Sequence, residues 1–150
     1  MDSPNADKDL AGQMVNQARI DKGLTWTQLA ALIDRPPVWT VSALLGKHPV
    51  PPVAADKVCA ELGLAEDVSA ALQRQPYRIA DPALATDPTI YRLHEAVNVY
   101  GPAIKELIHE QFGDGIMSAI NFSVDFDKTE DLHGDRVKIT FNGKFLPYQW

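Results

Sequence analysis

The chain has 150 residues, enough for one or two small domains, and its apolar fraction of 45% is ordinary for a globular protein. No apolar run approaches the ~20 residues of a membrane-spanning helix, and the polar, acidic start of the chain lacks the regions of a secretory signal. The net charge of −6 disfavours a nucleic-acid partner, and the single cysteine, Cys59, cannot form an intrachain disulfide, which favours a cytoplasmic setting.

Short helices are predicted along the first half of the chain. Apolar residues repeat at helical spacing from Leu10 to Ala18, and Gly23 is the predicted stop. Thr25 and Gln28 have the spacing of a capping box at the start of a second helix. Further helical patterns cover residues 38–45, 53–62 and 66–73, and the first two end at Gly46 and Gly63.

Three prolines between Pro76 and Pro88 predict an extended linker. The last of them suits the first turn of a new helix, with Asp87 as its N-cap. The predicted organisation is an N-terminal helical bundle over residues 1–75, a linker over 76–88 and a C-terminal domain over 89–150.

Two helices and a small β ribbon are predicted for the C-terminal domain, which gives an α+β fold. Gly101-Pro102 is expected to break or kink the first helix. After the turn at residues 113–115 the apolar period changes from helical to alternating, which predicts strands at 122–126 and 137–141. Asn142-Gly143 is a turn signal, so a third short strand is expected at 144–146. So small a ribbon is marginal alone, and oligomerisation would stabilise it.

Arg92 and Glu95 are three residues apart and therefore share a helix face. Spacing alone favours a surface ion pair, which contributes little. The alternative is an arginine held by a carboxylate so that its planar fork binds a small carboxylate-like anion.

Ser118 lies in an apolar stretch after two glycines, Gly113 and Gly115, that flank an acid. One interpretation is a helix cap and tight turn, with the serine hydroxyl bonded to backbone. The other is a turn whose N–H groups face a ligand, to which Ser118 adds a hydroxyl. A hydrolase triad is unsupported, because the sequence has neither a G-x-S-x-G elbow nor an evident histidine base.

Metal and DNA sites are not predicted. The histidines have no metal-ligand spacing, and the acidic residues from Asp125 to Asp131 indicate a solvated loop. The helices could pass for a helix-turn-helix regulator, but the candidate recognition segment, residues 37–45, has no Arg, Lys, Asn or Gln to read bases. Residues 1–76 carry seven Lys/Arg against nine Asp/Glu, a net charge of −2.

Several blocks, in order, resemble the cyanase (cyanate hydratase) family over nearly the whole chain. The most specific are Phe112 to Phe122 and Gly143 to Pro147. The others are residues 24–26, 37–39, 43–46, 76–78 and 86–92. The family often has glycine after the helix where Ile33-Asp34 stands, and an aromatic residue where His94 stands. Neither difference touches the catalytic residues, and His94 is expected to affect the rate and pH profile more than the presence of activity.

The resemblance implies a bicarbonate-dependent decomposition of cyanate to ammonia and carbon dioxide through carbamate. It places the catalytic roles on Arg92, Glu95 and Ser118, with Arg92, Ser118 and Ala119 binding substrate. It implies no metal or organic cofactor, only bicarbonate as co-substrate. The family fold is a helix-turn-helix-like bundle with a C-terminal part that interlocks in dimers, five of which form a decamer with active sites between subunits. A DNA-binding regulator and a non-catalytic oligomeric scaffold are the rival functions; ammonia release from cyanate separates them from the enzyme.

Overall fold

The computed structural model describes residues 3–150. They fall into two compact units, one made of residues up to 78 with 124–140 and the other of residues 79–123 with 141–150. Helices and one small sheet together make a mixed fold, as expected. The division of the chain at residues 75 and 88 stays a prediction.

Five short helices pack around an apolar core in the first unit, and their starts and stops follow from local chemistry. The capping box is present, because Thr25 Oγ1 accepts from Gln28 N at 3.0 Å and Gln28 Oε1 accepts from Thr25 N at 2.8 Å. Gly63 ends its helix in the left-handed region at φ +68°, as predicted from its position. The helices are α1 (Ala6–Asp21), α2 (Trp26–Leu32), α3 (Pro37–Leu44), α4 (Pro52–Leu62) and α5 (Glu66–Gln73).

The core of this bundle contains one thiol and one ammonium group. Cys59 is buried, and burial followed by the charges of Asp56 and Asp67 raises the pKa of its thiol, which makes it an inert core residue. Lys8 is also buried, which lowers the pKa of its ammonium group. Its Nζ donates to the Leu72 carbonyl oxygen at 2.7 Å, at the end of α5, so this buried charge has a partner.

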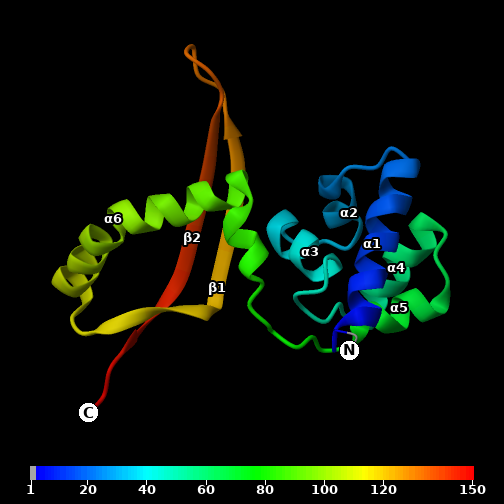
Figure 1. The fold of residues 1–150 in the computed structure, drawn as a ribbon, viewed down its shortest axis with the longest axis horizontal. Helices are drawn as coiled ribbons and strands as arrows, with labels where there is room; N and C mark the ends of the chain where they lie inside the picture. Colours follow the sequence, from blue (N-terminus) through cyan, green and yellow to red (C-terminus); the bar gives the residue numbers. More distant parts are fainter. Residues whose placement is uncertain (1–2) are drawn as a thin grey trace. The chain divides into compact units, whose positions relative to one another are not determined.

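A single long helix, α6 (Pro88–Phe112), stands where two helices were predicted. It follows a 3₁₀ turn, η1 (Pro82–Thr86), and starts as expected at Asp87, whose Oδ1 accepts from Thr89 N and Ile90 N. Pro102 lies inside the helix without ending it, and α6 bends part-way along its length (Figure 1). The predicted break into two helices is therefore wrong, whereas the alternative of a kinked helix agrees with this bend; Pro102 lacks only its own N–H donor, and α6 continues past it.

Two long strands, β1 (Gly115–Thr129) and β2 (Arg136–Pro147), pair into one two-stranded ribbon. The chain reverses at residues 130–135, where Gly134 has φ +123° and donates its N–H to the Asp131 carbonyl. The predicted turn at Asn142-Gly143 is wrong: these residues lie inside β2, and the expected third strand is its continuation. Within residues 3–150, no helix is long and apolar enough to cross a membrane.

Candidate functional site

Arg92 and Glu95 form the ion pair that their spacing predicts. Both lie near the start of α6, and Arg92 Nη1 is 3.1 Å from Glu95 Oε2. The two side chains are 67% and 53% exposed, so the pair alone contributes little to stability. The contact uses one edge of the guanidinium, whose remaining N–H groups can bind an anion while Glu95 limits the rotation of the side chain.

Ser118 lies in β1 and is almost fully buried. Its Oγ accepts two backbone hydrogen bonds, from Ile120 N at 3.1 Å and from Asn121 N at 3.0 Å. A hydroxyl oxygen has two lone pairs, so this arrangement occupies both and leaves the O–H proton as the group's free hydrogen-bonding capacity. Ser118 can therefore donate one further hydrogen bond, and its lone pairs are poorly placed for nucleophilic attack.

The two candidate clusters are not joined within one chain. Among the hydrogen bonds and ion pairs of residues 3–150, none links Ser118 to Arg92 or Glu95. Ala119 follows Ser118 in β1 and is exposed. A single chain thus presents a cationic group on α6 and a hydroxyl donor on β1.

Gly113 and Gly115, which precede Ser118, are glycines for different structural reasons. Gly113 ends α6 at φ +87° and donates its N–H to the His109 carbonyl. A Cβ atom at Gly115 would collide with the Leu146 carbonyl oxygen and the ring of Phe145. Close packing therefore explains Gly115, and a turn whose N–H groups face a ligand stays a hypothesis.

Gly143 is the neighbour of Ser118 that sequence reasoning missed. Its place in β2 brings it against residues 117 and 118 of β1, where a Cβ atom would lie 2.5 Å from the Ser118 carbonyl oxygen. The glycine at position 143 could have indicated close packing, but Asn-Gly is also typical of a hairpin turn. Only the pairing of the strands distinguishes a turn glycine from a packing glycine.

The histidines do not gather around the candidate residues. His48 stacks on Trp39 with ring centroids 6.1 Å apart, and burial, then the charges of Arg78 and Lys8, lowers the pKa of its ring. His94 is exposed on α6, and His109 Nδ1 is 3.0 Å from the Gly113 carbonyl oxygen. In the part of the chain that the structure describes, no group of three or more His, Cys, Asp or Glu residues is placed to hold a metal.

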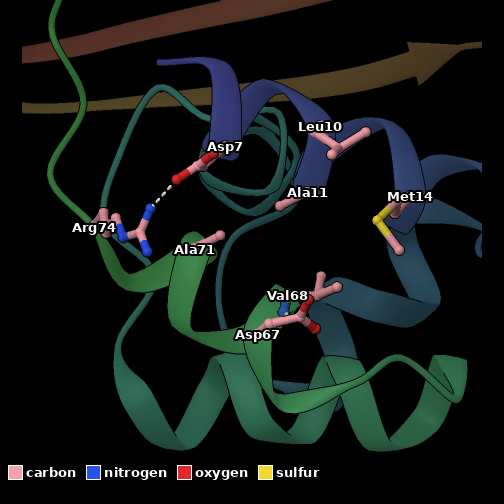
Figure 2. A pocket seen from close by; sticks show the side chains of 8 residues that line it. All are labelled: Asp7, Leu10, Ala11, Met14, Asp67, Val68, Ala71 and Arg74. Carbon is pink, nitrogen blue, oxygen red and sulfur yellow. Dashed lines mark hydrogen bonds and ion pairs between the residues drawn. The ribbon is translucent and has the colours of Figure 1, made fainter. Parts of the chain in front are cut away.

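A groove of about 220 Å³ lies between α1 and α5 (Figure 2). Leu10 and Met14 supply apolar lining from α1, and the exposed Asp7–Arg74 ion pair lies at one end. None of the predicted site residues lines it, so it is not the candidate site.

Comparison with protein families matches almost the whole chain. Residues 8–76 match the family described as "Cyanate hydratase, N-terminal". Residues 82–150 match the one described as "Cyanate lyase C-terminal domain", which contains every candidate site residue.

Individual relatives agree with the family matches. A cyanate hydratase of Mycolicibacterium vanbaalenii is 59% identical over 134 residues, covering 89% of this chain and 88% of its own length. One from Teredinibacter turnerae is 49% identical over 132 residues, covering 88% of this chain and 90% of its own. Among solved structures, cyanase from T. urticae superimposes with a TM-score of 0.81 at 38% identity, over 91% of this chain and 96% of that one.

Proposed function

The chain belongs to the cyanate lyase family, whose members decompose cyanate with bicarbonate, and we propose that Arg92, Glu95 and Ser118 form its active site. The observation that carries this proposal is the state of Ser118, a buried hydroxyl whose oxygen already accepts two N–H groups and whose proton is free. Donors fixed in this way suit a reaction between two anions.

The reaction mainly requires that the two anions be positioned and that the charge of the joined species be stabilised. A bicarbonate oxygen attacks the cyanate carbon, and the joined species is a dianion. It takes up one proton and loses carbon dioxide, which leaves carbamate; carbamate then takes up a proton and releases ammonia and a second carbon dioxide. Bringing two reactants together in the right geometry supplies about 7–11 kcal/mol in favourable cases, and fixed donors supply further stabilisation.

Each residue has a distinct role in this scheme. Arg92 provides the positive charge and a planar fork that matches two linked carboxylate-like groups. Ser118 donates a hydrogen bond from its hydroxyl group to the anion, and the backbone N–H of Ala119 is a second hydrogen-bond donor on the same strand. Glu95 holds the guanidinium, as the 3.1 Å contact supports, and itself stays clear of the anions it would repel.

No metal or organic cofactor enters this proposal, and bicarbonate is the co-substrate. We place the enzyme in the cytoplasm, supported by its single, buried thiol. A specific DNA partner is not proposed, since α3 offers no Arg, Lys, Asn or Gln side chain for base recognition.

The functional form we propose is a homo-oligomer, a decamer of five interlocked dimers with active sites between subunits. Support comes from α6, which has no buried residue in the single chain. Its exposed apolar residues include Val97, Tyr100 and Ile104, each more than half exposed, and Ile120 of β1 is 97% exposed. Apolar surface of this extent on a soluble chain indicates a protein interface.

The direct test is ammonia release from cyanate by the assembled protein, with and without bicarbonate. We expect release only with bicarbonate, and we expect Ser118→Ala to assemble normally and lose about 10²–10³ in rate, as for other single donors removed from an anion site. Ammonia release that ignores bicarbonate would contradict the reaction, whereas normal turnover by assembled Ser118→Ala would remove only the serine from the site.

A further inference from the structure

We propose that Gly143 is a positioning residue for Ser118. Because Gly143 has no Cβ atom, Ser118 can lie close to β2, in the position from which its hydroxyl donates. The proposal rests on the catalytic role of Ser118 given above. Gly143 lies on β2 beside the segment of β1 that contains Ser118, and both strands belong here to the same compact unit.

The reason for glycine at this position is contact and not backbone conformation. Gly143 is absent from the glycines of residues 3–150 that have positive φ, so other residues could adopt its backbone angles. A Cβ atom would lie 2.5 Å from the Ser118 carbonyl oxygen and 2.5 Å from Met117 Cγ. Met117 has a flexible side chain that can move aside. The carbonyl of Ser118 is backbone, and it moves only if Ser118 moves.

A small displacement here would change what the hydroxyl can do. Ordinary van der Waals contact with a new Cβ atom requires β1 and β2 to move apart by about 1 Å at this point. Misplacement of Ser118 by 1 Å can reduce a rate about 10²-fold. The shift would also disturb the bonds of 3.1 and 3.0 Å that Ser118 Oγ accepts from Ile120 N and Asn121 N. With a lone pair released, the hydroxyl would no longer be held as a donor.

The test is steady-state kinetics of Gly143→Ala after its assembly has been checked by light scattering. We expect kcat to fall about as far as in Ser118→Ala, roughly 10²-fold, with a smaller change in the KM for cyanate. A double-mutant cycle gives the readout that a purely structural role would not produce. In the Ser118→Ala background, Gly143→Ala should cost no further activity, because the group it positions is already gone.

Two matched controls separate positioning from general damage. Gly23→Ala makes the same chemical change in the helical bundle, where the added Cβ meets no atom within 4 Å; it strains the backbone at φ +66°, but the assembled protein should keep its kcat. Gly115→Ala creates a collision in the same ribbon with residues 145 and 146. Any activity that Gly115→Ala loses should be lost equally in the Ser118→Ala background, since it does not act through the serine.

The outcomes are distinguishable. If Ser118→Ala is inactive and assembled Gly143→Ala is fully active, this inference is wrong and the proposed site stands. Additive losses in the cycle would equally overturn it. Full activity of Ser118→Ala would remove the serine from the proposed site and overturn this inference with it. If Gly143→Ala does not assemble, Met117→Ala is added to remove the side-chain part of the collision. Failure of that protein to assemble would show that Gly143 serves the architecture and would overturn the positioning role.

Discussion

Asp34 holds the backbone at φ +51°, a conformation that L-residues adopt at a cost. It follows α2, where Asp34 N donates to the Ala31 carbonyl and Arg35 N to the Ala30 carbonyl, so it occupies the usual place of a helix-ending glycine. We expect Asp34→Gly to stabilise the fold by about 0.5–1 kcal/mol, and Asp34→Val to destabilise it by more than that. Urea midpoints at fixed protein concentration measure both. A lower midpoint for the glycine variant would contradict this account.

His48 makes the stability of the helical bundle depend on pH. Because burial and then Arg78 and Lys8 hold the pKa of the folded ring below its ordinary 6.5, the unfolded chain takes up this proton first as the pH falls. Stability is therefore present above pH 6.5 and lost as the pH drops below it. We expect His48→Gln to flatten the fall of the urea midpoint in that window. A fall as steep in His48→Gln as in the wild type would contradict this account.

Substitution of Arg92 tests whether activity requires the planar fork of the guanidinium as well as its positive charge. Oxalate and malonate resemble two linked carboxylates, so they should inhibit and compete with bicarbonate. Arg92→Lys keeps the charge and loses the fork, and we expect activity to fall about 10²-fold with a parallel loss of oxalate sensitivity. Glu95→Gln should have the smaller effect if Glu95 only orients the arginine. Arg78→Lys is the matched control, and full activity with full oxalate inhibition in Arg92→Lys would exclude this site.

At the scale of the elements, predictions succeeded where the cause is local. The capping box at Thr25, the stop at Gly63 and the cap at Asp87 each depend on residues within one turn, and so does the Arg92–Glu95 pair. The location of Gly143 depends on strand pairing, which local signals do not encode, and at Pro102 the local signal left a break and a kink open. The glycine pattern around Ser118 left two interpretations open, and only the resemblance to the family gave Ser118 a catalytic role.

Asp87 fixes the start of the helix that presents Arg92. Its Oδ1 accepts from Thr89 N at 2.8 Å and Ile90 N at 3.0 Å, which satisfies two N–H groups of the first turn. We expect Asp87→Ala to cost about 1 kcal/mol, and Asp87→Ser to recover most of it. Asp81→Ala removes a similar cap from the short turn η1 and should cost less. Equal urea midpoints for wild type and Asp87→Ala would contradict a stabilising cap.

The whole molecule carries a charge of −6 and yet acts on anions, so its long-range field repels its substrates. Screening limits that repulsion to about 8 Å at physiological ionic strength. Binding must therefore come from groups in direct reach, of which the single chain offers a cation on α6 and a hydroxyl on β1. An active site between subunits would bring such groups together from different chains.

Assembly is thus expected to be a condition of activity, and α6 is where it can be tested. We expect light scattering to give ten times the chain mass of 16.5 kDa. Ile104 is 52% exposed on α6 in the single chain, and Ile104→Asp would place a charge in the proposed interface. That variant should give smaller species and lose activity in proportion to the lost decamer.

Lys105→Asp introduces the same side chain one position along and is the matched control, since Lys105 is already polar and exposed. It should keep its mass and its turnover. The decisive comparison is activity against mass as the proteins are diluted. If Ile104→Asp is a monomer that still releases ammonia from cyanate at the wild-type rate, the site lies within one chain, and both the proposed interface and the sharing of residues between subunits are wrong.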